Sequence, residues 1–326
     1  MIILTGGAGM IGSMIAWHLN TILNDKEIII VDELNHPSKE KNIAKRNFLE
    51  FVEKEKMFAF LKTQKKINAI IHMGAISDTT ENNFNNLLFS NIRFSQQLWS
   101  YCASNKIPFI YASSAATYGL GEHGYDDDCE LHQFSPLNAY GYSKHFFDCW
   151  VKNQISANQI APPQWCGLKF FNVYGPNEYH KGRMASVVYH AYSQFKQDGI
   201  IKLFKSNHPD FENGMQLRDF IYVKDAVKCV IFLLQNSHIS GLFNVGTGKA
   251  QSFKSLAQAV AKNLGSDDTI IRYVNMPDDL NDKYQYYTEA SIKKLRESHY
   301  TDDFMNLDHG VTDYLQNYLL TNDKHA

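Results

Sequence analysis

The sequence Met1-Ile-Ile-Leu-Thr-Gly-Gly-Ala-Gly-Met-Ile-Gly12 decides the fold. Its apolar start fits a buried parallel strand, and Gly6, Gly9 and Gly12 follow at once. Such glycines permit a tight turn, a close approach of the backbone to a pyrophosphate and tight packing of a helix on a strand. The helical stretch 11–23 would then point its N-terminal amides at the phosphates. The segment therefore predicts a strand-turn-helix unit that binds a dinucleotide.

A second apolar strand, 28–31, ends in Asp32, twenty residues after Gly12. A carboxylate at this place can accept a hydrogen bond from the adenosine ribose, which by itself favours NAD. The loop that follows carries Lys39 and Lys41, whose ammonium groups can neutralise a 2′-phosphate. These residues alone leave the choice between NAD and NADP open.

Further strand-like and helical segments alternate along the chain, which predicts an α/β fold with a Rossmann-type doubly wound parallel sheet. Beyond Pro176 the alternation fades, which predicts a smaller α/β substrate-binding lobe. We expect residues 1–171 plus 219–247 in the dinucleotide-binding domain and 172–218 plus 248–326 in the lobe. Other expected elements are a charged helix at 42–66, strands at 67–72, 108–114, 165–171, 218–225 and 241–248, and helices at 82–105, 185–197 and 252–264.

The composition is that of an ordinary soluble protein. Of 326 residues, 44% are apolar and 20% charged, and the formal net charge is −2. Neither nucleic acid nor a membrane surface is indicated as a partner, so we expect a small substrate. No apolar run approaches the roughly 18 residues of a membrane span. The glycine-rich turn follows Met1 too closely for a secretion signal, which predicts a cytoplasmic protein.

No metal site is expected. The five cysteines are scattered without a C-x-x-C pair, which indicates neither zinc nor a disulfide framework. The acidic run Asp126-Asp-Asp128 has no companion ligands at a recognised spacing, so we interpret it as a solvated loop.

A candidate proton acceptor lies in Tyr140-Gly-Tyr-Ser-Lys144. Residues four apart in a helix share one face, and a nearby ammonium lowers the pKa of a phenol. Tyr142 would point to a different side, so Tyr140 is the better candidate. Ser114 ends the strand at 108–114 and can bind the same substrate oxygen. Together with the glycine-rich turn, these residues predict hydride transfer at a carbinol.

Five segments together resemble the extended short-chain dehydrogenase/reductase family of nucleotide-sugar enzymes, and the likeness runs from Met1 to about residue 320. They are the glycine-rich turn, Ser113-Ser-Ala-Ala-Thr-Tyr-Gly119, Tyr140-Gly-Tyr-Ser-Lys144, Phe171-Asn-Val-Tyr-Gly-Pro176 and Arg218-Asp-Phe-Ile-Tyr-Val223. Further marks, His180-Lys-Gly182, Met184-Ala-Ser186 and Phe243-Asn-Val-Gly-Thr-Gly248, narrow the resemblance to epimerases that act at C6 of an ADP-linked heptose.

The resemblance implies a homo-oligomer, with a pentamer as the expected assembly, that supplies inner-core heptose of lipopolysaccharide. It further implies transient oxidation to a ketone and re-reduction by tightly bound NADP, because Lys39 matches the position that favours NADP. Lys181 matches a second acid/base, and our hypothesis is that Tyr140 and Lys181 serve the two epimers.

By the same matching, cofactor contacts fall on Gly6, Gly9, Met10, Ile11, Gly12, Asp32, Glu33, Lys39, Met73, Gly74, Ala75, Ile76, Ser77, Asn91, Tyr140, Lys144, Val173 and Lys181. Substrate contacts fall on Ser114, Asn172, Arg183, His190, Phe204, Lys205, Ser206, Asn207, Arg218 and Tyr284. Three residues depart from the pattern: Arg183 replaces a small serine, Met10 replaces an aromatic residue, and Met73 replaces an acid.

Three rival functions differ in what they need from these residues. A 4,6-dehydratase needs an acid beside the catalytic hydroxyl, and Ala115 and Ala116 offer none. A UDP-hexose 4-epimerase can use the same tyrosine and lysine, so it stays open as an alternative. A non-catalytic NADP-binding sensor has no need for Tyr140 and Lys144, and their presence argues against it.

Overall fold

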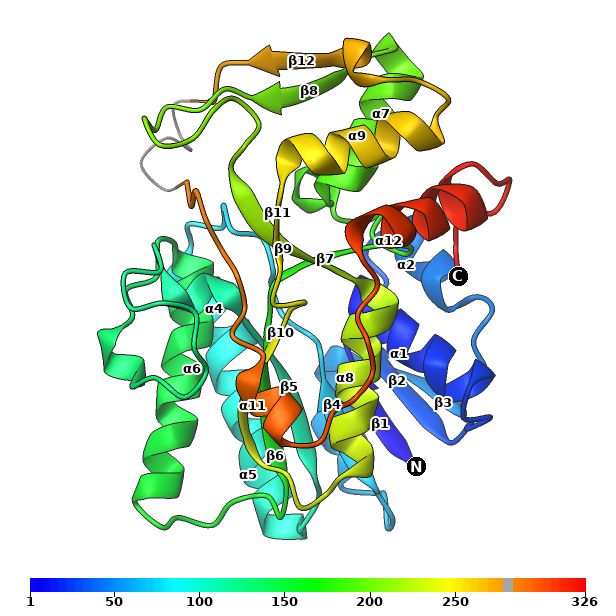
Figure 1. Ribbon diagram of the computed structural model, residues 1–326. Helices are drawn as coiled ribbons and strands as arrows, with labels where there is room; N and C mark the ends of the chain where they lie inside the picture. Colours follow the sequence, from blue (N-terminus) through cyan, green and yellow to red (C-terminus); the bar gives the residue numbers. More distant parts are fainter. Residues whose placement is uncertain (278–283) are drawn as a thin grey trace.

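A parallel seven-stranded sheet forms the centre of the computed structural model, which describes residues 1–277 and 284–326 (Figure 1). The strand order is β10-β6-β5-β4-β1-β2-β3. This doubly wound order has its switch point between β1 and β4, where ligands bind in such sheets. It confirms the predicted Rossmann-type fold class. The strands are β1 (Ile2–Thr5), β2 (Ile28–Asp32), β3 (Glu50–Glu53), β4 (Ala69–His72), β5 (Phe109–Ser114), β6 (Trp165–Phe170) and β10 (Gly241–Val245).

Helices cover both faces of this sheet, so its inner strands are mainly apolar. Alternate residues of β1 show the division: Ile2 and Leu4 belong to one core cluster, while Ile3 belongs to the other. Side chains of α1 (Met10–Thr21) and α8 (Val223–Gln235) complete the first cluster. Those of α5 (Phe94–Asn105) and α6 (Ala139–Ser156) complete the second.

The helix predicted over 42–66 is wrong. That segment holds the end of α2 (Pro37–Ile43), the edge strand β3, a 3-10 turn η1 (Lys54–Lys56) and the short helix α3 (Met57–Leu61). In β3 only Val52 is buried, and it lies beside Val31 of β2. The charged residues around it suit an edge strand that faces water on one side, and this hid the strand in the sequence.

Two small sheets and several helices lie above the carboxyl ends of the large sheet (Figure 1). The sheets are β11-β9-β7 and β12-β8. This placement supports the expected substrate-binding lobe, although the predicted domain limits stay a prediction. The elements are β7 (Asn172–Tyr174), α7 (Val187–Asp198), β8 (Ile201–Phe204), β9 (Leu217–Tyr222), β11 (Ala250–Ser252), α9 (Phe253–Asn263), β12 (Ile271–Val274) and α12 (Leu307–Tyr314).

Shorter elements complete the part of the chain that the structure describes. Within 1–277 and 284–326, no helix is both long and apolar enough to cross a membrane. The remaining elements are α4 (Phe84–Leu87), α11 (Lys293–Glu297), the π-helical segments η2 (Leu88–Arg93) and η7 (Leu315–Leu319), and the 3-10 turns η3 (Ala115–Tyr118), η4 (Leu131–Gln133), η5 (Gly182–Met184) and η6 (Asp268–Ile270).

Candidate active site

The turn between β1 and α1 has the shape that a dinucleotide needs. Gly6 has a φ of +65°, and a Cβ added there would lie 2.5 Å from the amide nitrogen of Gly74. A Cβ added at Gly12 would lie 2.1 Å from the carbonyl oxygen of Gly6. The first turn of α1 has no side-chain cap at Gly9, so its amides are available to an anion. These features fit the pyrophosphate of a nicotinamide dinucleotide.

A cleft of about 490 Å³ opens beside this turn and brings most of the predicted site residues together. It draws on the ends of β1, β2, β4 and β5, the start of α6 and segments of the smaller lobe. The predicted residues that line it are Gly6, Gly9, Met10, Ile11, Gly12, Asp32, Lys39, Met73, Gly74, Ala75, Ser77, Ser114, Tyr140, Lys144, Asn172, Val173 and Lys181.

Asp32 and Lys39 form an ion pair at the end of β2. Lys39 Nζ lies 2.8 Å from Asp32 Oδ1 and also donates to the carbonyl of Glu33. The other carboxylate oxygen of Asp32 accepts a 2.8 Å hydrogen bond from the amide of Ala8, in the glycine-rich turn. The residue expected at the ribose and the one expected at a 2′-phosphate are therefore in contact.

A second cavity, of about 280 Å³, adjoins the first and is lined by Glu33 and Ile76 together with Asp32 and Lys39. Asn91 lies behind it, in the π-helical η2. Its side chain accepts from the amide of Ile76 and donates to the carbonyl of Ile76, both at 2.9 Å. The side chain of Asn91 is buried and lines neither cavity, and its predicted contact with the cofactor stays a prediction.

The candidate catalytic residues meet where β5 ends and α6 begins. Asn138 caps α6 by accepting a 2.8 Å hydrogen bond from the amide of Gly141, which places Tyr140 and Lys144 in the first two turns. Ser114 forms a hydrogen bond with Tyr140. The ammonium of Lys144 donates to the carbonyl of Ala112 at 2.8 Å.

The electrostatics of this group differ from the expectation that Lys144 lowers the phenol pKa. Burial raises the pKa of Tyr140, and the hydrogen bond from Ser114 acts in the opposite direction. Burial also lowers the pKa of Lys144 to about 8. In this arrangement the lysine is held by the backbone of β5, and Ser114 is the group that favours the phenolate.

Lys181 enters the cleft from the loop between β7 and α7. One buried carboxylate closes this loop, because Glu178 accepts hydrogen bonds from the amide of Ser186 and, at 2.7 Å, from its hydroxyl. Burial lowers the pKa of Lys181, whereas the negative charge of Glu178 raises it. A lysine with a lowered pKa can exchange a proton nearer neutral pH than an exposed one.

Arg218 and Tyr284 do not line the cleft themselves, but Arg218 contacts a residue that does. The guanidinium of Arg218 stacks 5.6 Å from the ring centre of Phe253, which lines the cleft, and 5.1 Å from that of Tyr284. Arg218 also donates to the carbonyls of Leu217 and Gln285. Two aromatic rings and two carbonyl groups thus fix the orientation of the Arg218 guanidinium in the absence of substrate.

The remaining predicted substrate residues do not line the cleft either. Arg183 is exposed in η5, and its carbonyl lies 3.2 Å from Nε2 of His190 on α7. Phe204 ends β8, and the three residues after it are exposed or half-buried. None of these six residues lines the cleft, and their contacts with a substrate stay a prediction: Phe204, Lys205, Ser206, Asn207, Arg183 and His190.

Several lining residues were not predicted. His180 precedes Lys181, and burial lowers its pKa to about 4, which keeps the imidazole neutral. Its place in the His180-Lys-Gly182 motif was a usable signal. Phe253 and Leu256 come from the first turns of α9, and an amphipathic helix gives no sign of which turn meets a cleft.

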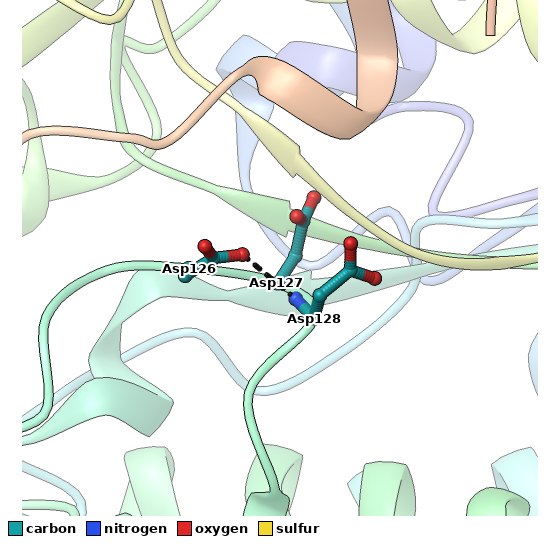
Figure 2. Close-up of side chains that lie close together, drawn as sticks. All are labelled: Asp126, Asp127 and Asp128. Carbon is teal, nitrogen blue, oxygen red and sulfur yellow. Dashed lines mark hydrogen bonds between the residues drawn. The ribbon is translucent and has the colours of Figure 1, made fainter. Parts of the chain in front are cut away.

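The acidic run at 126–128 brings three carboxylates within 4.8 Å of one another (Figure 2). Lys294 Nζ lies 2.7 Å from Asp128, and the amide of Asn244 donates to Asp127 at 2.6 Å. Burial raises the pKa of Asp127 to about 6. Lys294 and the amide of Asn244 offset part of this charge. Asp127 is buried, so the expectation of a solvated loop is wrong for this residue, whereas the expectation that no metal binds stays a prediction.

The fold and cleft define the class of protein. A model of the NAD dependent epimerase/dehydratase family matches residues 2–246, so the chain belongs to this family.

Individual relatives of the chain carry narrower enzyme names than the family. The chain is 50% identical over 336 residues to the ADP-L-glycero-D-manno-heptose-6-epimerase of Fusobacterium nucleatum, covering 100% of both chains. It is 44% identical over 329 residues, again covering 100% of both, to the enzyme of the same name from Nitratidesulfovibrio vulgaris. Among solved structures, the Helicobacter pylori ADP-L-glycero-D-manno-heptose-6-epimerase superposes with a TM-score of 0.80 at 27% identity, covering 97% of this chain and 95% of that one.

Proposed function

We propose that the protein converts ADP-D-glycero-D-manno-heptose to ADP-L-glycero-D-manno-heptose by inverting C6. The observation that carries the proposal is that Tyr140, Ser114 and Lys144 share one cleft with Lys181, beside a turn shaped for a dinucleotide. The full-length relatives that bear this enzyme name support the choice of substrate. The product would supply the inner-core heptose of lipopolysaccharide.

The reaction needs both redox chemistry and proton transfer. A bound nicotinamide dinucleotide would supply the redox chemistry, which is reversible hydride transfer at C6, and Gly6, Asp32 and Lys39 would help to hold it. Tyr140 exchanges the proton of the C6 hydroxyl, with Ser114 hydrogen-bonded to the phenol and able to share the substrate oxygen. Lys144, fixed on the carbonyl of Ala112, supplies a positive charge at the same end of the cleft.

Inversion returns hydride to the face of the planar C6 ketone opposite the one it left, so the C6 oxygen lies in two orientations in turn. One proton carrier cannot serve both epimers equally. Lys181 lines the same cleft from a different segment and has a pKa that burial lowers. We assign Tyr140 to one epimer and Lys181 to the other. Arg218, stacked between Phe253 and Tyr284, is suited to the diphosphate of the substrate.

We propose NADP as the cofactor. Lys39 carries a positive charge at the end of β2, where the adenosine ribose of a dinucleotide lies in this fold. Its contact with Asp32 offsets the charge of the carboxylate that would otherwise repel a 2′-phosphate.

We also propose a homo-oligomer, with a pentamer as the assembly to test. An exposed aromatic group near the site supports self-association: Tyr142 and Phe146 lie on the outer side of α6, 5.8 Å apart between ring centres. Phe84 of α4 packs edge-on against Phe146. Analytical ultracentrifugation measures the state directly. The cytoplasmic location stays a prediction.

The test of the function uses the purified protein and two substrates. With ADP-D-glycero-D-manno-heptose, NMR should show the C6 epimer appearing until the two epimers reach equilibrium. A UDP-hexose should remain unchanged. No change of the heptose together with turnover of the hexose would identify a 4-epimerase instead. Turnover of neither, with a dinucleotide bound, would favour a sensor.

A further inference from the structure

A buried ion pair lies directly behind the end of β5. Lys169 Nζ, on β6, is 2.9 Å from Asp148 Oδ2, on α6, and neither side chain has exposed surface. Neither residue lines the cleft. Removing two charges from water costs several kcal/mol per ion unless further hydrogen bonds satisfy them. The hydrogen-bond partners of Asp148 and Lys169 therefore show which segments the ion pair joins.

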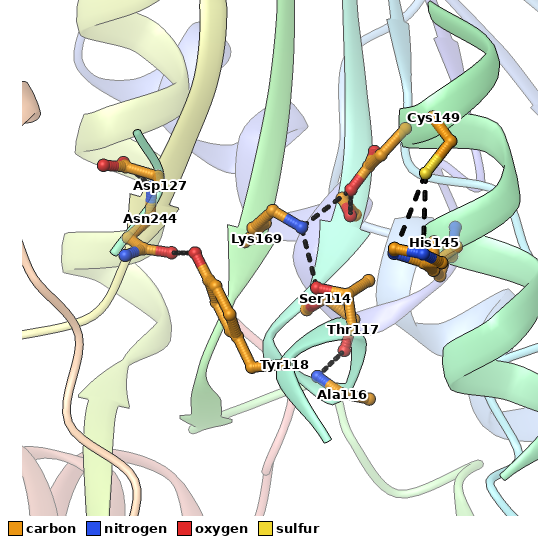
Figure 3. Close-up of polar contacts among 12 residues, drawn as sticks. Ser114, Ala116, Thr117, Tyr118, Asp127, His145, Cys149, Lys169 and Asn244 are labelled. Carbon is orange, nitrogen blue, oxygen red and sulfur yellow. Dashed lines mark hydrogen bonds and ion pairs between the residues drawn. The ribbon is translucent and has the colours of Figure 1, made fainter. Parts of the chain in front are cut away.

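Those partners come from the strand that carries Ser114. Tyr111 donates to Asp148 Oδ1 at 3.0 Å and Ser113 donates to Asp148 Oδ2 at 2.7 Å. Lys169 lies beside Ser113 in the register of β5 and β6 and makes a second hydrogen bond, of 2.7 Å, to Thr117 Oγ1 (Figure 3). One carboxylate thus accepts three hydrogen bonds from two neighbouring strands.

The residues between and after these donors contact the catalytic side chains. Ala112, between Tyr111 and Ser113, gives its carbonyl to Lys144. Ser114 hydrogen-bonds Tyr140, and its own carbonyl accepts a 2.8 Å bond from Thr117. Lys144 and Asp148 lie one turn apart on α6. Asp148 therefore holds the end of β5 through Tyr111 and Ser113. The same strand end contacts Lys144 through Ala112 and Tyr140 through Ser114.

We propose that Asp148 is a positioning residue for the catalytic pair, tying α6 to the end of β5 so that Ser114 and Lys144 keep their places beside Tyr140. Its catalytic consequence rests on the function proposed above. The charge of Asp148 has a second effect, because it raises the pKa of Tyr140 and that of Lys144. Other titratable groups face the catalytic pair, Tyr140 and Lys144, from the elements packed around it. They are Asp148, His145 and Cys149 on α6, Lys169 on β6, Tyr111 on β5, His72 on β4 and Lys181 in the loop before α7.

A charge-removing double variant, Asp148→Asn with Lys169→Met, tests the electrostatic part without leaving an unpaired buried charge. Its tyrosinate absorbance is titrated with cofactor bound, and the same titration in a Tyr140→Phe background isolates Tyr140. We expect Tyr140 to titrate at lower pH than in the unaltered protein. The matched control, Asp225→Asn with Lys228→Met, removes another buried carboxylate and its lysine, 3.0 Å apart on α8, and should leave Tyr140 unchanged. An unshifted Tyr140 in the first double variant would overturn the electrostatic part.

A second double variant, Tyr111→Phe with Ser113→Ala, tests the positioning part and keeps both charges. We expect kcat to fall roughly 10- to 100-fold with KM little changed, as for small misplacements of reacting groups. Wild-type kcat would overturn the proposal, and this variant decides if the charge-removing one does not fold. The titration needs no substrate, so it still decides if the unaltered protein proves inactive on the heptose. That inactivity would instead contradict the proposed function.

Discussion

Lys144 donates a 2.8 Å hydrogen bond to the carbonyl oxygen of Ala112, so the backbone of β5 fixes the ammonium at the cleft. The neighbouring Ser114, on the same strand, hydrogen-bonds the phenol of Tyr140. A strand end thus orients both members of the helix-spaced pair. This division of contacts supports the proposal that Tyr140 transfers the proton and that Lys144 supplies a fixed charge.

The first prediction concerns Tyr140. Tyr140→Phe should lower kcat for epimerisation by roughly 10²- to 10⁴-fold, the usual contribution of a positioned proton carrier. Thermal unfolding should change little, because the ring remains. Tyr142→Phe is the matched control, since Tyr142 is 38% exposed and should retain full turnover. Equal rates for the two variants would remove Tyr140 from the mechanism.

A second prediction concerns Lys181. Lys181→Met keeps the length of the side chain and removes its proton, so epimerisation should fall by at least about 100-fold while the bound dinucleotide remains reducible by substrate. Lys202→Met, in an exposed i,i+4 pair with Asp198, is the control and should be active. Full-rate epimerisation by Lys181→Met, measured from both epimers, would show that inversion needs no second carrier.

The third prediction concerns the choice of dinucleotide. Lys39→Ala should weaken NADP binding by roughly 10- to 100-fold, the magnitude of one lost charge-assisted hydrogen bond, and should leave NAD binding less affected. The dinucleotide extracted from the purified protein, assayed for a 2′-phosphate, gives the readout, with Lys41→Ala as control. Extraction of NAD alone from the unaltered protein would contradict the proposal of NADP.

A fourth prediction concerns stability in acid. Burial lowers the pKa of His72 from 6.5 to about 3, and its ring is bonded to Thr5 and Ser95. Below the unfolded pKa, only the unfolded chain takes up this proton, so stability present above pH 6.5 is lost as the pH falls toward about 3. His72 alone should remove about 2 kcal/mol of unfolding free energy between about pH 7 and 5.

Urea unfolding at the two pH values measures this difference. In His72→Gln the loss between them should be smaller, because the new side chain takes up no proton. His123→Gln, in an exposed loop, should lose as much as the unaltered protein. The same pH dependence in all three proteins would show that His72 is not the group responsible.

The sequence predicts most of the large sheet because strands such as β1, β2 and β4 are mainly apolar, and the glycines at 6, 9 and 12 permit the tight turn after β1. Strand β3 was mistaken for helix because an edge strand needs only one buried side chain, Val52. The buried pair of Asp148 and Lys169 was missed as well. Lys169 is a charge inside an otherwise uncharged strand, but its partner lies 21 residues away on a helix, and only the packed structure joins them.

The cofactor side of the site was more predictable than the substrate side. Turn geometry and the end of β2 are local features. The residues named for them line the cleft, except Glu33, which lines the adjoining cavity. The segment Phe204 to Asn207 begins at the end of β8, which pairs with β12, and no local pattern reveals this pairing. Their role was inferred from resemblance and stays a prediction.

The most direct test of the account follows the hydrogen at C6. The purified protein is given ADP-D-glycero-D-manno-heptose in deuterium oxide, and NMR follows both the epimer ratio and the C6 signal. Oxidation and re-reduction within one cleft predicts that the two epimers reach equilibrium and that C6 keeps its original hydrogen. Deuterium at C6 of the product, or an unchanged heptose, would contradict it.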